Sequence, residues 1–220
     1  MFDANCLKLM FVAGSQDFYH IKGTKNDRIN ALLDSLESAL QSKITAFQFR
    51  QKGDLALQDP VEIKQLALEC QKLCQKYGVP FIVNDEAKLA LELKADGVHV
   101  GQEDMAIEEV VSLCKKHQFI GLSVNTLEQA LKARHLDGVS YLGVGPIFPT
   151  QSKKDIKQVV GVGLLKKIKD SGVKKPLIAI GGITIHNASK LREYGGIAVI
   201  SAITQAKDKA LAVGKLLNNA

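Results

Sequence analysis

The residues after the second apolar run of the sequence combine positive charge with amide groups. They are Gln48, Phe49, Arg50, Gln51 and Lys52. In an extended strand alternate side chains share a face, so Gln48, Arg50 and Lys52 would point the same way. Two cations and an amide suit a bound anion, and arginine adds bidentate geometry. A strand end that simply turns polar is the alternative.

Two carboxylates, Asp85 and Asp104, follow the third and fourth apolar runs. If those runs are neighbouring parallel strands, the loops that follow them lie roughly 5–10 Å apart. Mg²⁺ typically binds one or two carboxylates together with waters and phosphate oxygens, so this pair predicts a magnesium site. Glu103 competes with Asp104 for the second position, and Asp85 could instead cap the next helix.

Hydroxyl groups follow the fifth and sixth runs. Thr126 and Gln129 form a capping-box pattern, which leaves Ser123 free to reach a ligand. The segment after the sixth run extends to about Gly163, which is long for such a connection. It places Thr150 and Ser152 beside Lys153, a set that could close over a polyphosphate.

The last two runs end in small residues. Gly181 and Gly182 follow the seventh run, and Ser201 follows the eighth. Barrel enzymes often bind a phosphate between these two loops, where glycines let backbone amides approach the oxygens. The cations and carboxylates above would suit a metal-bound diphosphate, and this second site a monophosphate. Dinucleotide and P-loop signatures are missing, and no serine or cysteine nucleophile has an obvious base beside it.

The elements that position these residues alternate along the chain. Short runs rich in Val, Ile and Phe predict eight strands, and amphipathic stretches between them predict helices. The strands cover 7–13, 46–50, 81–83, 97–100, 119–123, 141–144, 177–180 and 197–200, and the helices 28–42, 61–77, 86–93, 107–117, 126–135, 163–170, 187–194 and 207–218. Eight such units predict one (β/α)₈ barrel domain over residues 1–220. A doubly wound open sheet is the alternative.

The amino-acid composition argues against two classes of binding partner, nucleic acids and membranes. The 220 residues carry a net charge of +6, but only 5% are aromatic and there is no Trp, so no nucleic-acid surface is indicated. No segment approaches the roughly 20 apolar residues of a membrane helix, and we expect a cytoplasmic protein that does not bind membranes. We expect the four cysteines to be reduced, and leave open whether Cys70 meets Cys74 and whether the chain forms a homo-oligomer.

Taken together, the motifs resemble those of the thiamine phosphate synthase family, in the same order and from about residue 46 to about 205. The matching segments are Gln48 to Lys52, Asn84-Asp85, Ala95 to Asp104, Gly145 to Lys153, Ala179 to Ile183 and Ile200-Ser201. The first 45 residues match weakly. Ser152 stands in place of a threonine of the family, and Gly195 where family members often carry Asp.

This resemblance implies a (β/α)₈ barrel, Mg²⁺ as cofactor, and two small phosphorylated substrates. A pyrimidine diphosphate and a thiazole phosphate would give thiamine phosphate and pyrophosphate by dissociative substitution. The pyrimidine diphosphate would contact the segment Gln48 to Lys52, together with Asn84, Ser123 and Lys153. The thiazole phosphate would contact Thr150, Gln151, Ser152, Gly182, Ile200 and Ser201, and Asp85 and Asp104 would bind the metal. Arg50, Lys52, Ser123 and Lys153 are the implied catalytic residues.

Two other functions fit the same fold. A thiazole tautomerase would share the phosphate loops but need a general acid and base rather than a diphosphate site with metal. A non-catalytic sensor of thiamine precursors would lack a ligand-binding residue, and none is missing here.

Overall fold

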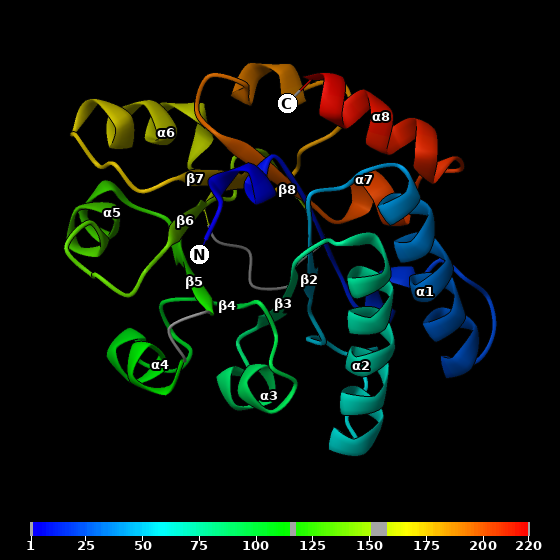
Figure 1. The fold of residues 1–220 in the computed structure, drawn as a ribbon. Helices are drawn as coiled ribbons and strands as arrows, with labels where there is room; N and C mark the ends of the chain where they lie inside the picture. Colours follow the sequence, from blue (N-terminus) through cyan, green and yellow to red (C-terminus); the bar gives the residue numbers. More distant parts are fainter. Residues whose placement is uncertain (1, 115–117, 151–157, 220) are drawn as a thin grey trace.

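The computed structural model describes residues 2–114, 118–150 and 158–219. Eight parallel strands form a closed barrel in sequence order (Figure 1). They are β1 (Leu9–Ala13), β2 (Ala46–Phe49), β3 (Phe81–Asn84), β4 (Gly97–Val100), β5 (Phe119–Val124), β6 (Tyr141–Val144), β7 (Leu177–Ile180) and β8 (Gly196–Val199). Leu9 of β1 pairs with Ile197 of β8, which closes the sheet. The predicted barrel is therefore confirmed, and the open-sheet alternative is wrong.

The strands are apolar on both faces because helices cover the outside of the barrel and side chains fill its interior. On the outside, the Phe11 and Phe47 rings lie 5.6 Å apart, and Phe47 and Phe81 continue the row at 6.3 Å. The interior cluster includes Met10 and Tyr141. Two buried faces explain why these strands read as continuous apolar runs rather than as alternating patterns.

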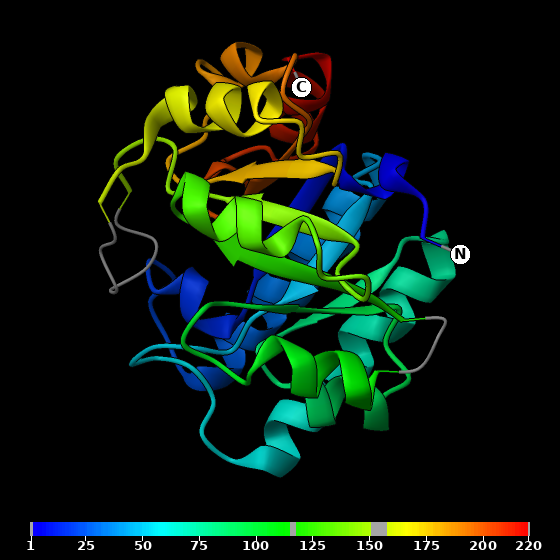
Figure 2. The same ribbon diagram turned by 90° about the vertical axis from the view of Figure 1, so that its left-hand side faces the viewer.

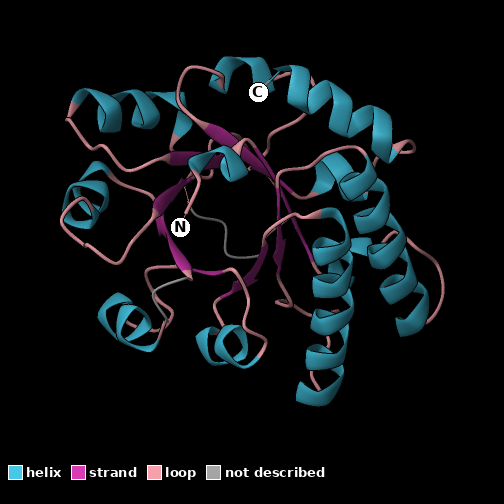
Figure 3. Ribbon diagram, in the orientation of Figure 1, coloured by secondary structure: helices cyan, strands magenta, loops and turns pink. Residues whose placement is uncertain are grey.

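The helices form an outer ring around the strands (Figure 3). They are α1 (Lys25–Gln41), α2 (Pro60–Tyr77), α3 (Ala87–Glu92), α4 (Ile107–Leu113), α5 (Leu127–Ala133), α6 (Gly161–Asp170), α7 (Ser201–Thr204) and α8 (Lys209–Asn219). The Asp59 side chain caps α2 by accepting from the Val61 amide, and Gly78 ends it in the left-handed region at φ 66°. The predicted capping box of Thr126 and Gln129 is present at the start of α5.

The N-terminal segment lies across one end of the barrel (Figures 1 and 2). The 3₁₀ helix η1 (Ala4–Leu7) precedes β1, and a second one, η2 (Ser15–Phe18), follows it. The Phe2 ring lies 5.1 Å from that of Phe119 and 6.1 Å from that of Tyr141, so the segment closes the base of the interior core. The interior of the barrel is therefore covered at the end where the strands begin.

Some helix predictions differ from the structure. The predicted helix over 187–194 is only a 3₁₀ turn, η3 (Ala188–Leu191), and the short α7 was not predicted. Helix α4 ends at Leu113, whereas the prediction ran to His117, which lies outside the described residues. Gly195 has φ 147°, and a Cβ there would lie 2.2 Å from the Leu177 carbonyl oxygen. This close crossing accounts for glycine at that position.

Cys70 and Cys74 are both buried on α2 as free thiols, and burial raises the pKa of each. Within the described ranges, no helix has both the length and the apolar character needed to cross a bilayer.

Candidate active site

A cavity of about 510 Å³ opens among the segments that follow the carboxyl ends of the strands. This is the end at which barrel enzymes carry their active sites, and the volume suits small organic ligands. Most of the predicted site residues line it: Arg50, Lys52, Asn84, Asp85, Glu103, Asp104, Ser123, Thr150, Gly182, Ile200 and Ser201. Side chains that are far apart in the sequence are thus brought to one place.

Arg50 is the buried cation of this cavity. It follows β2, and its backbone is fixed by the Ala13 carbonyl at 3.0 Å and by the Gln16 amide group at 2.7 Å. The residue is only 6% exposed, and among the described residues its guanidinium has no hydrogen-bond or ion-pair partner. Burying a charge without a partner is unfavourable, so Arg50 is poised to bind an anion from solution.

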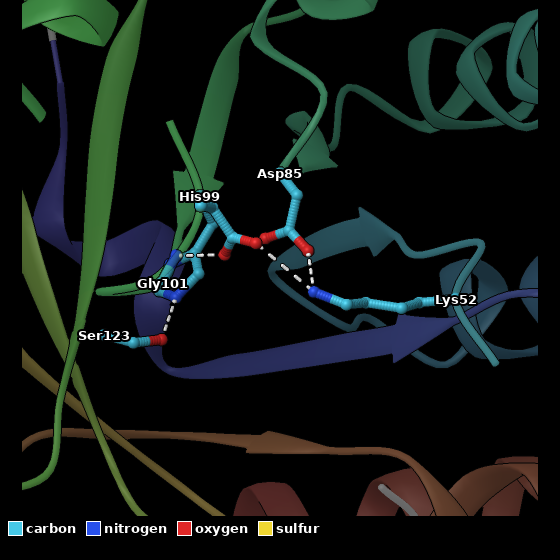
Figure 4. Close-up of polar contacts among 6 residues, drawn as sticks. Lys52, Asp85, His99, Gly101 and Ser123 are labelled. Carbon is cyan, nitrogen blue, oxygen red and sulfur yellow. Dashed lines mark hydrogen bonds and ion pairs between the residues drawn. The ribbon is translucent and has the colours of Figure 1, made fainter. Parts of the chain in front are cut away.

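Lys52 and two carboxylates form a charged cluster at the rim (Figure 4). The Lys52 ammonium lies 2.7 Å from Asp85 and 3.3 Å from Asp104. Burial alone would lower the pKa of Lys52, but the hydrogen bonds and charges of the two carboxylates raise it above its usual value. Lys52 therefore stays charged and holds the two acids together.

The two carboxylates are not equivalent. Burial raises the pKa of Asp85, and the neighbouring Asp104 adds to that effect, while Lys52 opposes it. Burial alone would also raise the pKa of Asp104, but hydrogen bonds with Asp85, the Gly101 amide and Lys52 lower it. The Gly101 amide donates to Asp104 at 2.8 Å. Asp104 is thus the better stabilised anion of the pair.

Asp85 does not cap the helix that follows it. Its backbone has φ 64°, an uncommon left-handed conformation for a residue other than glycine. Its amide donates to the His99 carbonyl at 2.8 Å, and its side chain turns toward Lys52. The strained backbone places the carboxylate beside Asp104, so the capping alternative is wrong.

Ser123 enters the cavity from β5. Its hydroxyl lies 2.9 Å from Nε2 of His99 (Figure 4), and its carbonyl accepts from the Gln102 side chain at 2.6 Å. His99 is buried, and its contact with Ser123 corrects the expectation that no serine has an obvious base beside it. The serine is therefore fixed on two sides while its hydroxyl remains at the cavity wall.

The opposite wall is built from backbone. Gly182 has φ 64°, and a Cβ there would lie 2.4 Å from the Pro149 carbonyl oxygen. The Asn187 side chain donates to the Gly182 carbonyl at 3.0 Å and accepts from the Thr184 amide at 2.8 Å. The Phe148 amide donates to the Gly181 carbonyl at 3.0 Å. These bonds join the loops after β6 and β7 into one surface.

Three predicted residues do not line this cavity. Gln48 is buried in the barrel interior, where its amide nitrogen lies 3.6 Å from the Met10 sulfur. The Phe49 ring faces the helices, 6.2 Å from Phe81. Gln51 accepts from the Leu57 amide at 3.1 Å and so supports the β2 loop. Their roles toward a substrate stay predictions, as do those of Gln151, Ser152 and Lys153, which lie outside the described residues.

Several lining residues were missed by the sequence reasoning. Asn125 donates from its side chain to the Gly145 carbonyl and reaches the cavity beside Ser123. Gln102 and Ile180 also line it. Asn125 is the first residue after β5 and Gln102 the second after β4, and this position is the signal that could have identified them.

Three comparisons place this geometry among known proteins. A family model described as thiamine monophosphate synthase matches residues 18–203. A thiamine-phosphate synthase of Helicobacter pylori is 91% identical over 220 residues, which are 100% of both chains. One of Pasteurella multocida is 53% identical over 97% of this chain and 96% of its own length.

The solved structure of a thiamine phosphate pyrophosphorylase from Pyrococcus furiosus has a TM-score of 0.80 and 34% identity, and the match covers 98% of this chain and 96% of that one. The order of the site motifs and the closed barrel agree with these matches. The chain therefore belongs to the thiamine-phosphate synthase family of transferases.

Proposed function

We propose that the mouth of this barrel joins 4-amino-5-hydroxymethyl-2-methylpyrimidine diphosphate to 4-methyl-5-(2-hydroxyethyl)thiazole phosphate. The products would be thiamine phosphate and pyrophosphate. The observation that carries the proposal is Arg50, a buried cation that faces the cavity and has no partner within the described part of the chain. A diphosphate group would supply the missing negative charge.

The cavity offers different chemistry to the two substrates. Arg50 and Lys52 stand on the side of β2, next to the carboxylates after β3 and β4, which suits a diphosphate bound with a cation. Gly182 and Ser201, after β7 and β8, offer backbone amides and a hydroxyl, which suit a monophosphate.

Asp85 and Asp104 fit a magnesium ion. Both are oxygen donors of the kind Mg²⁺ prefers, and both already contact one cationic group, the Lys52 ammonium. The described residues include no cluster of three or more His, Cys, Asp or Glu side chains that could hold a metal. A magnesium ion held by two carboxylates would take its remaining ligands from water and phosphate. When bound, the ion supplies charge neutralisation of the diphosphate.

The residues then have separate tasks. Arg50 and Lys52 stabilise the negative charge that develops on the diphosphate as its bond to the pyrimidine methylene breaks. The amino group of the pyrimidine ring stabilises the resulting cation. The loops after β7 and β8 hold the thiazole so that its nitrogen, which carries no proton, can attack. Because the attacking nitrogen carries no proton, this step requires no general base.

The test is to incubate the purified protein with both phosphorylated precursors and Mg²⁺, and to measure thiamine phosphate and pyrophosphate. The proposal expects the two products in equal amounts and none when either precursor is omitted. A folded protein that makes neither product would contradict it, and thiazole isomerisation without metal would then favour the tautomerase alternative. The cytoplasmic location stays a prediction, and the oligomeric state stays open.

A further inference from the structure

A row of polar side chains crosses the barrel interior directly beneath the cavity. Gln48, Tyr141, His99 and Ser123 come from β2, β6, β4 and β5. The Tyr141 hydroxyl lies 3.0 Å from Nδ1 of His99, and Nε2 of the same ring lies 2.9 Å from the Ser123 hydroxyl. Tyr141 is fully buried, and Gln48 and His99 are nearly so. Barrel interiors are usually filled by branched apolar side chains, so this row needs an explanation.

The sequence provides the space for this row. Gly121 and Gly143 occupy positions of β5 and β6 that face the barrel interior. A Cβ at Gly121 would lie 2.2 Å from the Tyr141 ring and 2.4 Å from Nδ1 of His99. A Cβ at Gly143 would lie 2.8 Å from the His99 ring. Two neighbouring strands thus lack side chains where the two rings meet.

The donors and acceptors of the row can be placed in order. The Gln48 amide nitrogen lies 3.6 Å from the Met10 sulfur, a weak acceptor that donates nothing. Burial raises the pKa of Tyr141 far above its usual range, and Gln48 opposes this effect only in part. The phenol therefore keeps its proton, and Nδ1 of His99, 3.0 Å away, is the acceptor that the row offers for it.

A neutral imidazole carries its hydrogen on one nitrogen only. With Nδ1 accepting from Tyr141, the hydrogen lies on Nε2 and is donated to the Ser123 oxygen. The hydrogen of the Ser123 hydroxyl then has to point elsewhere, and Ser123 lines the cavity. We propose that Tyr141 and His99 are positioning residues that make Ser123 a hydrogen-bond donor to the pyrimidine diphosphate. This inference rests on the proposed function for the identity of the ligand.

The direction of the row can be measured on the unaltered protein. Long-range ¹⁵N–¹H correlation spectra of ¹⁵N-histidine-labelled protein distinguish the two neutral tautomers. Among the described histidines only His99 is buried, so its protection from solvent exchange identifies it. We expect the hydrogen on Nε2. A hydrogen on Nδ1 would reverse every bond of the row and overturn the proposal.

The effect on Ser123 is tested by a double-substitution cycle of Tyr141→Phe and Ser123→Ala, read out as the affinity for the pyrimidine diphosphate with Mg²⁺. Tyr141→Phe keeps the ring and removes only the hydroxyl. We expect it to weaken binding about fivefold to tenfold when Ser123 is present, and by less than about twofold in the Ser123→Ala background. Ser123→Thr, which keeps a hydroxyl, should restore most of the Ser123→Ala loss.

The possible outcomes distinguish the positioning role of Tyr141 from the proposed reaction. An equal loss in both backgrounds would mean that Tyr141 acts on the fold and not through Ser123, and would overturn the positioning role. Normal binding and coupling without turnover would overturn the proposed reaction alone. No binding to the unaltered protein would overturn both.

Discussion

Arg50 and Lys52 face the same cavity, yet only Lys52 is paired with carboxylates among the described residues. Both cations follow the end of β2, and both line the cavity. Lys52 is held by Asp85 and Asp104, whereas Arg50 is buried with its charge available. A bound diphosphate would give Arg50 the negatively charged partner that it lacks among the described residues.

The first prediction concerns Arg50→Met, which keeps much of the volume and removes the charge. Loss of one preorganised donor should lower kcat/KM about 10²–10³-fold. Because the buried guanidinium has no described protein partner, its removal should leave the thermal unfolding temperature unchanged or higher. Steady-state rates and thermal unfolding check both parts.

Lys72→Met, which makes the same charge change at an exposed position of α2, is the matched control. A marked fall in stability for Arg50→Met would show a structural role instead.

A second prediction concerns pH and Asp85→Asn. Since burial raises the pKa of Asp85, the charged form is less favourable in the folded chain than in the unfolded one. The neutral carboxyl stabilises the folded chain fully at pH values below the ordinary pKa of 3.8. This stabilisation is lost as the pH rises through the raised pKa of Asp85 in the folded chain. The variant should thus be more stable than the parent at pH 7, and the difference should disappear near pH 3. Asparagine also tolerates the positive φ.

Denaturant unfolding at the two pH values checks this prediction, and the activity of the same variant should be lost. Higher stability with lower activity is the usual result when an unfavourable charge is kept for function. A variant less stable than the parent at pH 7 would mean that the ion pair with Lys52 outweighs the burial of Asp85.

A third prediction tests the packing of the barrel interior. Gly121→Ala would force a methyl group against Tyr141 and His99, and overpacking of this kind costs about 1–3 kcal/mol. In contrast, a Cβ at Gly163 on α6 would meet nothing within 4 Å. Gly163→Ala should therefore be neutral or stabilise by about 0.5–1 kcal/mol. Denaturant unfolding of the two variants gives the comparison, and similar stabilities would contradict the crowded interior.

A fourth prediction separates the two substrates. Gly182→Ala places a Cβ 2.4 Å from the Pro149 carbonyl oxygen at a positive φ, so the loop after β7 must shift. We expect the KM for the thiazole phosphate to rise about tenfold or more, since a shift of about 1 Å can cost 10²-fold. The KM for the pyrimidine diphosphate should change little. Equal changes in both constants would argue against separate sites.

The sequence predicted the barrel because its signals were local. Asp59 and Pro60 begin α2, Thr126 and Gln129 cap α5, and the predicted strand over 97–100 coincides with β4. Helix α7 has four residues, too few for any periodicity to show. The 187–194 segment has an apolar pattern but forms only a 3₁₀ turn before the close crossing at Gly195.

The sequence predicted which side of a strand the site residues occupy, but not in which layer of the barrel interior each side chain lies. Strand periodicity placed Gln48 on the same side as Arg50, but the layer in which a side chain lies depends on the register between strands. In β1 and β2, Val12 lies opposite Gln48, inside the barrel and below the cavity. The contact of His99 with Tyr141 likewise depends on pairing across β4, β5 and β6, which no single segment encodes.

The central claim is that the cavity makes thiamine phosphate with Mg²⁺ held by Asp85 and Asp104. The most direct measurement is the initial rate of thiamine phosphate formation in EDTA and after return of Mg²⁺, for the parent protein and for Asp85→Asn and Asp104→Asn. The claim predicts that EDTA abolishes the parent rate, that Mg²⁺ restores it, and that neither variant recovers at the same concentration. A full parent rate in EDTA, or full recovery of both variants, would contradict it.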